Sequence, residues 1–126
     1  MKKLKILIVE DDINAQLMLS ILIEKFSKET IVTNNGIEGL EACRENEDID
    51  LILMDIQMPK MNGYEATQKI REFNKKVLII AQTAYGLTED KERALALGFN
   101  YFISKPIDRK LLENIMRDEF QGPLST

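Results

Sequence analysis

The sequence predicts a doubly wound α/β protein, in which a five-stranded parallel sheet carries helices on both faces. Five short apolar runs alternate along the chain with five amphipathic segments, which is the order that repeated β/α units require. The runs are nearly continuous in aliphatic residues, as in Leu51–Met54, so both of their faces are expected to be buried. Charged and hydroxyl side chains follow directly after the runs, where open parallel sheets place their functional sites.

Each apolar run is predicted to form one strand. The second run is the least apolar and is expected to lie at an edge of the sheet. The predicted strands are Leu4–Val9, Thr30–Thr33, Leu51–Met54, Val77–Ala81 and Tyr101–Ser104.

The first helix is predicted from Ile13 to Ser27, with Asp12 as its N-cap. Apolar residues at helical spacing are expected to face the sheet. They are Ala15, Met18, Leu19, Leu22 and Phe26.

Turn and capping residues predict the other helix boundaries. Asn35-Gly36 and Asn62-Gly63 open the second and third helices, and the fourth begins at Thr88 and stops at Gly98. The last helix is predicted over Arg109 to Glu119. Its buried face consists of Leu111, Leu112, Ile115 and Met116.

Length and composition indicate a single domain. The 126 residues suffice for one hydrophobic core, so we expect a domain over 1–120, with 121–126 as a flexible tail or the start of a linker. No apolar run approaches the roughly 20 residues that cross a membrane. The acids at Glu10, Asp11 and Asp12 interrupt the first apolar run, which a secretory signal would not allow. We therefore expect a cytoplasmic domain without membrane contact.

Charge and residue usage exclude several functions. The net charge of −4, without a basic cluster, argues against nucleic-acid binding. The chain has no histidine, so it cannot itself be a histidine kinase or a histidine phosphotransfer domain. Cys43 is the single cysteine, which excludes an internal disulfide and predicts a small buried apolar residue.

The residues that follow four of the strands are predicted to form one site. Right-handed crossovers bring the first, third, fourth and fifth strands together, so their carboxyl ends share one crevice. The residues at those ends are Glu10, Asp11, Asp12, Asp55, Gln82, Thr83, Ala84, Lys105 and Pro106.

This set of side chains predicts a hard cation and a phosphoryl group. Clustered carboxylates repel one another unless a cation lies among them, and an all-oxygen ligand set suits Mg²⁺, with Mn²⁺ as a substitute, better than Zn²⁺. A phosphoryl group on Asp55 would meet the metal, Lys105 and the Thr83 hydroxyl. Charge neutralisation and positioning could then carry the transfer without a general base.

Four stretches at the strand ends match a known family. They are Ile8–Asp12, Met54–Gly63, Thr83-Ala84 and Ser104–Ile107. From Leu4 to Met116 the chain resembles the CheY-like receiver domain of response regulators in two-component signalling, and most of all the receivers of hybrid sensor histidine kinases.

The resemblance implies a flavodoxin-like sheet in the order 2-1-3-4-5 and phosphorylation of Asp55 by a histidine kinase or a histidine phosphotransfer domain. It also implies Mg²⁺ bound by Asp11, Asp55 and the backbone carbonyl of Gln57, with Glu10 acting through a metal-bound water. Many members of the family carry aspartate in place of Glu10, whose longer side chain is expected to affect metal affinity. The chain could be part of a larger hybrid kinase.

The resemblance also implies a switch. Lys105 would pair with the phosphoryl oxygens across a cis bond to Pro106, while Thr83 and the adjacent Ala84 meet the same group. Phe102 is expected to turn inward when Thr83 moves. Gln57 lies two residues after Asp55, and Tyr85 lies two residues after Thr83. Either side chain could control the access of water to the phosphoryl group, or it could be an ordinary surface residue.

A docking surface is predicted on the first helix. Leu17 and Ile21 lie one turn apart, outside the stripe that faces the sheet, on a flank that borders Pro106 and Ile107. A histidine-bearing helix must approach there to reach Asp55. Ala15 belongs to the same predicted surface.

Two other functions stay open at this point. An aspartyl-phosphate hydrolase would need a general acid two residues after Asp55, where this chain has the amide Gln57. A receiver that only docks partners would not need the complete set of acids and Lys105. For Asp12 an N-cap role is favoured over metal contact, and for Glu10 a role in the site is favoured over that of a solvated acid.

Overall fold

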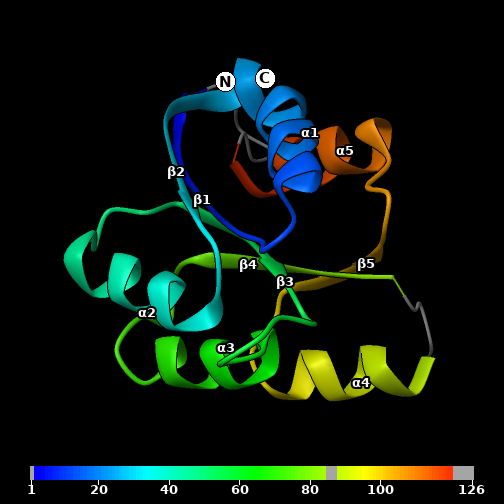
Figure 1. Ribbon diagram of the computed structural model, residues 1–126. Coiled ribbons are helices and arrows are strands. Elements are labelled where there is room, and N and C mark those ends of the chain that lie inside the picture. Colours follow the sequence, from blue (N-terminus) through cyan, green and yellow to red (C-terminus); the bar gives the residue numbers. More distant parts are fainter. Residues whose placement is uncertain (1, 85–87, 121–126) are drawn as a thin grey trace.

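The computed structural model describes residues 2–84 and 88–120 and has the predicted alternation of strands and helices (Figure 1). The strands are β1 (Leu4–Val9), β2 (Ser27–Thr33), β3 (Leu51–Asp55), β4 (Leu78–Thr83) and β5 (Tyr101–Ser104). The α-helices are α1 (Ile13–Ile23), α2 (Gly36–Glu45), α3 (Gly63–Arg71), α4 (Thr88–Ala96) and α5 (Arg109–Phe120).

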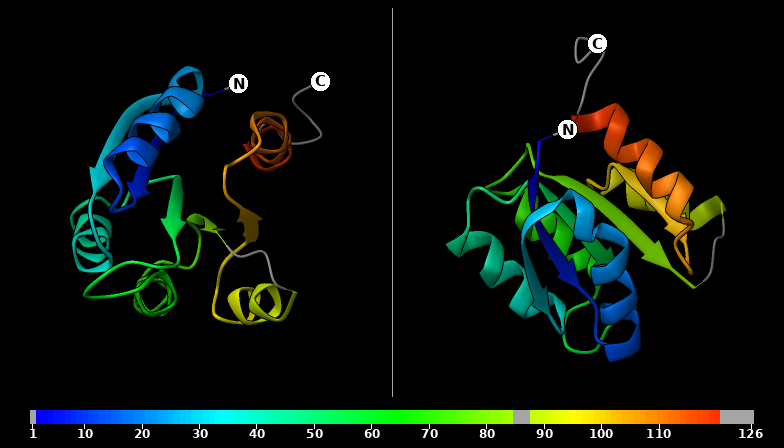
Figure 2. Two further views of the ribbon diagram at one scale, coloured as in Figure 1. Left: turned by 45° about the vertical axis from the view of Figure 1, so that its right-hand side comes forward. Right: turned by 90° about the horizontal axis from the view of Figure 1, so that it is seen from above.

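All strand pairs are parallel, and the sheet has the order β2-β1-β3-β4-β5. Helices α1 and α5 cover one face, and α2, α3 and α4 cover the other (Figures 1 and 2). The predicted doubly wound fold and its strand order are confirmed. Among the described residues, no helix is both long enough and apolar enough to span a membrane.

The core has two layers, one on each face of the sheet. Because side chains alternate along a strand, neighbouring residues such as Leu7 and Ile8 of β1 enter different layers, and both are fully buried. This explains the nearly continuous aliphatic runs. Cys43 belongs to the layer under α2, α3 and α4, where burial raises the pKa of its thiol to about 12, as expected for a structural cysteine.

The predicted N-caps are present. Asp12 accepts a hydrogen bond from the backbone N–H of Ala15 at 2.8 Å, and Asn35 and Asn62 cap α2 and α3 in the same way. Helix α4 begins at Thr88 as predicted, but capping by its side chain lies outside the described residues, as do Tyr85 and the tail 121–126.

The first helix ends earlier than predicted. Helix α1 stops at Ile23, a 3₁₀ turn follows, and Ser27, predicted to be helical, is the first residue of β2. There it pairs with Leu4 of β1, so cross-strand backbone bonds replace those of a further helical turn. Strand β4 also runs on to Thr83, two residues beyond its predicted end.

Two residues that were predicted to be buried in the core are exposed, so these two predictions are wrong. Met18 of α1 is 52% exposed, and Leu111 of α5 is 42% exposed. In α1 the buried positions are Leu19 and Ile23, one turn apart, which rotates the packed face away from Met18. The remaining residues of the predicted face of α5 are buried.

Candidate functional site

The carboxyl ends of β1, β3 and β5 bring three charged side chains into contact. Lys105, directly after β5, places its Nζ 2.9 Å from Oε1 of Glu10 and 3.3 Å from Oδ1 of Asp55. Glu10 follows β1 and Asp55 ends β3, and both carboxylates are buried. The predicted convergence of these residues is therefore observed.

Asp11 completes an acidic cluster. One carboxylate oxygen from each of Glu10, Asp11 and Asp55 lies within 4.8 Å of the others. Two of these three carboxylates, those of Glu10 and Asp55, contact the ammonium of Lys105, and Asp11 is exposed at the outer side. Such an excess of negative charge, built only from oxygen ligands, fits a divalent hard cation. Asp12 is not among these three residues.

Backbone contacts fix the two buried carboxylates. The N–H of Asp12 donates to Oε2 of Glu10 at 3.1 Å, and the side-chain amide of Gln16 donates to the Glu10 carbonyl at 2.7 Å. The N–H of Gln57 donates to Oδ1 of Asp55 at 3.3 Å, while the Gln57 side chain is exposed. Glu10 is therefore a positioned buried group and not a solvated acid.

A glycine allows the chain to turn closely past Asp55. A Cβ on Gly63 would lie 2.4 Å from the Asp55 carbonyl oxygen, closer than any side chain permits. The N–H of Gly63 also donates to the Ile56 carbonyl at 2.9 Å. The start of α3 thus packs directly against the backbone that presents the Asp55 carboxylate.

The environment of Asp55 disfavours its charged form. Burial, and next the charge of Glu10, raise the pKa of Asp55 to about 7, although Lys105 opposes this effect. For Lys105, burial alone would lower the pKa, but its contacts with Glu10 and Asp55 outweigh burial and raise it. The ammonium stays charged while the carboxylates compete for it.

The residues predicted to sense the phosphoryl group lie on β4 and β5 or directly after them. Thr83 is the buried last residue of β4, and Ala84, which follows it, is exposed. The backbone N–H of Lys105 donates to the Thr83 carbonyl at 2.7 Å, and the Lys105-Pro106 peptide bond is cis, as predicted. Phe102 of β5 is half-buried against the core layer under α3 and α4.

A groove borders the site on the α1 side. It has a volume of about 360 Å³ and lies between α1 and the segment after β5. Of the predicted docking residues, Ala15, Pro106 and Ile107 line this groove. Leu17 and Ile21 do not line it, but they are 60% and 63% exposed, as predicted.

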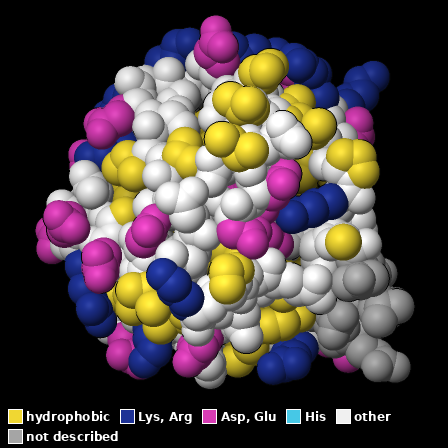
Figure 3. All heavy atoms as spheres, in the orientation of Figure 1, with side chains coloured by type: hydrophobic (Ala, Val, Ile, Leu, Met, Phe, Trp, Pro, Cys, Tyr) yellow, Lys and Arg dark blue, Asp and Glu magenta, His cyan; other side chains and the backbone are white. Residues whose placement is uncertain are grey.

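Hydrophobic side chains gather over α1 next to the charged centre of this face (Figure 3). Besides the predicted Leu17 and Ile21, the exposed apolar residues of α1 include Ile13 and Met18, and Met18 also lines the groove. Gln82 was placed at the end of the fourth strand from the sequence but was given no role; it lines the groove from β4 and is buried. Its polar side chain within an apolar strand was the only signal in the sequence.

Comparison with known proteins identifies the class. The family model of the response regulator receiver domain matches residues 6–117, and the chain belongs to this family of two-component signalling domains.

Two relatives illustrate how such domains occur. The chain is 40% identical over 129 residues to "Hybrid signal transduction histidine kinase G" of Dictyostelium discoideum, covering 98% of this chain but only 4% of that protein. It is 42% identical over 105 residues to "Polar-differentiation response regulator DivK" of Brucella anthropi, covering 81% of this chain and 84% of the relative. The chain therefore spans a small part of the hybrid kinase and most of the stand-alone regulator.

Solved structures agree with the fold and the family. The receiver domain of Ssk1 from Saccharomyces cerevisiae, crystallised with the histidine phosphotransfer protein Ypd1, gives a TM-score of 0.85 at 31% identity over 93% of this chain and 88% of that one. The receiver domain of the sensor histidine kinase PA1611 from Pseudomonas aeruginosa, which has magnesium in its active-site cleft, gives 0.81 at 33% identity over 91% and 95%.

Proposed function

We propose that Asp55 accepts a phosphoryl group from a phosphohistidine of a partner protein and that this modification switches the conformation of the domain. The observation that carries the proposal is the contact of Lys105 with both Asp55 and Glu10, which gathers an ammonium and the acidic cluster around one buried carboxylate. Membership of the receiver family supports the same role.

The transfer needs little covalent chemistry from the protein. An oxygen of Asp55 forms a bond to phosphorus, the phosphorus–nitrogen bond of the phosphohistidine breaks, and the leaving imidazole takes up a proton. Lys105 is placed to follow the charge onto the phosphoryl oxygens, because its ammonium already lies 3.3 Å from the accepting carboxylate. The hydroxyl of Thr83 and the backbone at Ala84 would bind the same oxygens.

The acidic cluster fits Mg²⁺, with Mn²⁺ as a substitute. Asp11, Asp55 and the backbone carbonyl of Gln57 would hold the ion directly, and Glu10 would do so through water. When bound, the ion supplies positive charge that offsets the carboxylates and the incoming phosphoryl group. The magnesium in the related PA1611 receiver supports this assignment.

The switch would couple Thr83 to Phe102. We propose that Thr83 moves toward the phosphoryl oxygens and that the half-buried ring of Phe102 turns into the vacated space. Phenylalanine has no hydroxyl to bury, so the inward state of Phe102 loses no hydrogen bond. Gln57 would tune access of water to the site, and Tyr85 is proposed for the same role from its position in the sequence.

Intact mass tests the modification. In the presence of Mg²⁺ and acetyl phosphate, the wild type should gain one phosphoryl group, and Asp55→Asn should gain none. Asp12→Asn is the matched control, because asparagine also caps a helix and the change removes a neighbouring acid outside the metal cluster. Labelling of Asp55→Asn would contradict the assignment.

The phosphodonor is proposed to dock on α1 and on the groove beside it. The exposed Leu17 and Ile21 and the groove residues Ala15, Pro106 and Ile107 form an apolar surface next to the site. The complex of the related Ssk1 receiver with Ypd1 supports a histidine phosphotransfer protein, or the corresponding domain of a kinase, as the partner. The similarity to hybrid kinases supports a place within a longer kinase chain.

Paired variants test the docking surface. Changing Leu17 and Ile21 to Ser should slow transfer from a phosphorylated histidine phosphotransfer protein about tenfold and leave acetyl phosphate labelling intact. The control changes Leu95 and Leu111, an equally apolar pair on α4 and α5 that is 44% and 42% exposed, to Ser. Slowing by the control pair, or slowing of both donors, would place docking elsewhere.

We favour a regulated acceptor over a phosphatase that turns over free phosphate esters. Gln57, whose side chain is exposed two residues after Asp55, cannot donate a dissociable proton to a leaving group. One phosphoryl group per chain without continued release of phosphate from excess ester would fit the acceptor role. We place this role in the cytoplasm, where histidine kinases present their phosphorylated domains.

A further inference from the structure

A second hollow borders the site on the opposite face of the sheet from the α1 groove. The two last residues of β4 separate them, since Gln82 lines the groove and Thr83 lines the hollow under α3 and α4. This hollow has a volume of about 590 Å³ and also includes Gln57, Tyr64 and Arg93. Residues that directly follow Asp55 in the sequence, Ile56 and Gln57, therefore form part of its lining.

Arg93 places a positive charge on the wall of the hollow. Arg93 is the only Lys, Arg, Asp or Glu among the described residues that line it, whereas the α1 groove contains both Asp12 and Lys105. The guanidinium carbon of Arg93 lies 4.5 Å from the centre of the Tyr64 ring. Tyr64 in turn packs edge-on against Phe99, with ring centres 6.2 Å apart. Stacking thus holds the cation on the wall of the hollow.

We propose that this hollow is a subsite for the leaving group of small anionic phosphodonors of the acyl phosphate class, with Arg93 as its specificity-determining residue. The inference rests on the proposed function of Asp55. An Asp55 oxygen forms a bond to phosphorus, the bond from phosphorus to the acyl oxygen breaks, and a carboxylate leaves with the electron pair. That carboxylate needs no proton, and the guanidinium of Arg93 pairs with its charge.

The same cation gives no advantage to other donors. The imidazole of a phosphohistidine leaves protonated, and the ammonia released from phosphoramidate is neutral or cationic, so neither presents a carboxylate to Arg93. The structure therefore predicts discrimination between small donors according to their leaving group.

Labelling rates test the proposal. Rates of mass gain are measured against donor concentration for acetyl phosphate and for phosphoramidate, both with Mg²⁺. Arg93→Ala should lower the second-order rate constant for acetyl phosphate about fivefold, which is the effect of a partly exposed ion pair, and leave the phosphoramidate rate nearly unchanged. Arg93→Lys should recover part of the acetyl phosphate rate, because it keeps the charge.

Arg44→Ala is the matched control. The guanidinium carbon of Arg44 lies 5.6 Å from the centre of the Phe73 ring, so this variant loses the same charge and the same kind of contact at the other end of the sheet. It should label like the wild type with both donors. A similar loss in Arg44→Ala would mean that overall charge attracts the donor and would overturn the proposal.

Two further outcomes decide the matter. Equal slowing of both donors by Arg93→Ala would mean that Arg93 acts only by packing on Tyr64, and no slowing would mean that the hollow does not receive the leaving group; either result overturns the inference and leaves the role of Asp55 standing. A wild type that gains no phosphoryl group from either donor would instead overturn the proposed function, and the inference with it.

Discussion

Buried charged residues have different surroundings at the two ends of the sheet. At the amino end, Nζ of Lys5, whose side chain is largely buried, lies 2.9 Å from Oδ1 of Asn46 and 2.9 Å from Oδ1 of Asp48, with Glu29 at 3.7 Å. At the carboxyl end, Nζ of Lys105 contacts two members of the acidic cluster, Glu10 and Asp55. Carboxylates outnumber ammonium groups at both ends, but Asp48 and Glu29 are exposed to water, whereas Glu10 and Asp55 are buried.

The pKa values follow this difference. The hydrogen bond with Asp48 raises the pKa of Lys5, and the same bond lowers the pKa of Asp48, so each group favours the charged form of the other. Burial and Glu10 instead raise the pKa of Asp55 to about 7, which disfavours its charged form. At the amino end the ion pair lies within the chain, whereas at the carboxyl end a bound cation would favour the charged form of Asp55.

The largest expected effect is on stability against pH. Unfolded Asp55 titrates near 3.8 and folded Asp55 at about 7, so between these values only the unfolded state has released its proton, and stability falls as pH rises. In metal-free buffer, the free energy of unfolding of Asp55→Asn minus that of the wild type should therefore increase with pH. The increase from about pH 4 to about pH 8 should be up to about 4 kcal/mol. Urea unfolding at a series of pH values, with chelator present, measures this difference.

Asp48→Asn supplies the control from the amino end. Because the pKa of Asp48 is lowered on folding, its carboxylate contributes stability that is present above about pH 4 and lost as pH falls through the folded value. The free energy of unfolding of Asp48→Asn should therefore decrease relative to that of the wild type as pH rises. Parallel stability curves for the wild type and Asp55→Asn would show that the carboxyl end is not under electrostatic stress.

Magnesium should offset much of the destabilisation that the charged form of Asp55 causes. An ion that binds the folded state alone adds about 2.7 kcal/mol at a concentration of about 100 times its dissociation constant. The melting temperature of the wild type should rise with Mg²⁺, and Asp11→Ala should lose most of the rise because it removes one carboxylate of the cluster. Asp48→Ala should keep the full response, although its starting stability is lower. A full rise in Asp11→Ala would exclude Asp11 from the metal site.

The sequence was sufficient for the features that depend on local order. Apolar runs such as Leu51–Met54 marked the buried strands, and the charged residues directly after them, among them Asp55 and Lys105, are brought together because parallel strands share one end. Short caps at Asp12 and Asn62 were readable because a side chain three residues before a backbone N–H can satisfy it locally.

Features set by packing were not predictable. Met18 and Ile23 are both apolar residues of α1, and only the seating of the helix on the sheet decides that Met18 faces out and Ile23 faces in. The burial of Gln82 depends on which side of β4 faces the groove, and the hollow at Arg93 depends on how α4 lies beside α3. The metal and phosphoryl roles of the assembled residues stay predictions until ions and donors are tested.

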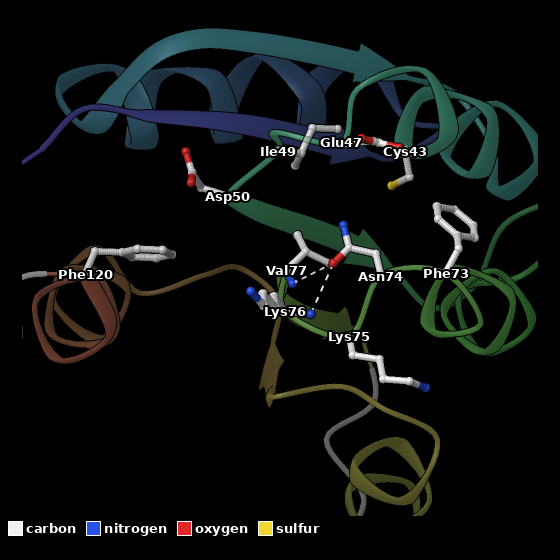
Figure 4. Close-up of a pocket in the computed structure, with 10 residues that line it drawn as sticks. All are labelled: Cys43, Glu47, Ile49, Asp50, Phe73, Asn74, Lys75, Lys76, Val77 and Phe120. Carbon is white, nitrogen blue, oxygen red and sulfur yellow. Dashed lines mark hydrogen bonds between the residues drawn. The ribbon is translucent and has the colours of Figure 1, made fainter.

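The smallest expected effects concern two side-chain amides at opposite ends of the sheet. At the amino end, Oδ1 of Asn74 accepts hydrogen bonds from the backbone N–H groups of Lys76 at 3.1 Å and Val77 at 3.0 Å (Figure 4). At the carboxyl end, Nε2 of Gln82 is buried and has no hydrogen-bond partner among the described residues. A buried donor without a partner costs about 1–3 kcal/mol, and an amide that pairs two N–H groups returns a similar amount.

Apolar replacements should therefore have opposite signs at the two ends. Gln82→Met keeps the length of the side chain and removes the unpaired donor, so it should raise the free energy of unfolding by about 1 kcal/mol. Asn74→Leu should lower it by about 1 kcal/mol, because it leaves the N–H of buried Val77 without its acceptor. Urea unfolding of both variants in one buffer, with chelator present, gives the comparison directly. If Gln82→Met were destabilised as much as Asn74→Leu, the amide of Gln82 would stabilise the fold as that of Asn74 does. The acidic cluster would then be the one destabilising polar feature among the described residues at the carboxyl end.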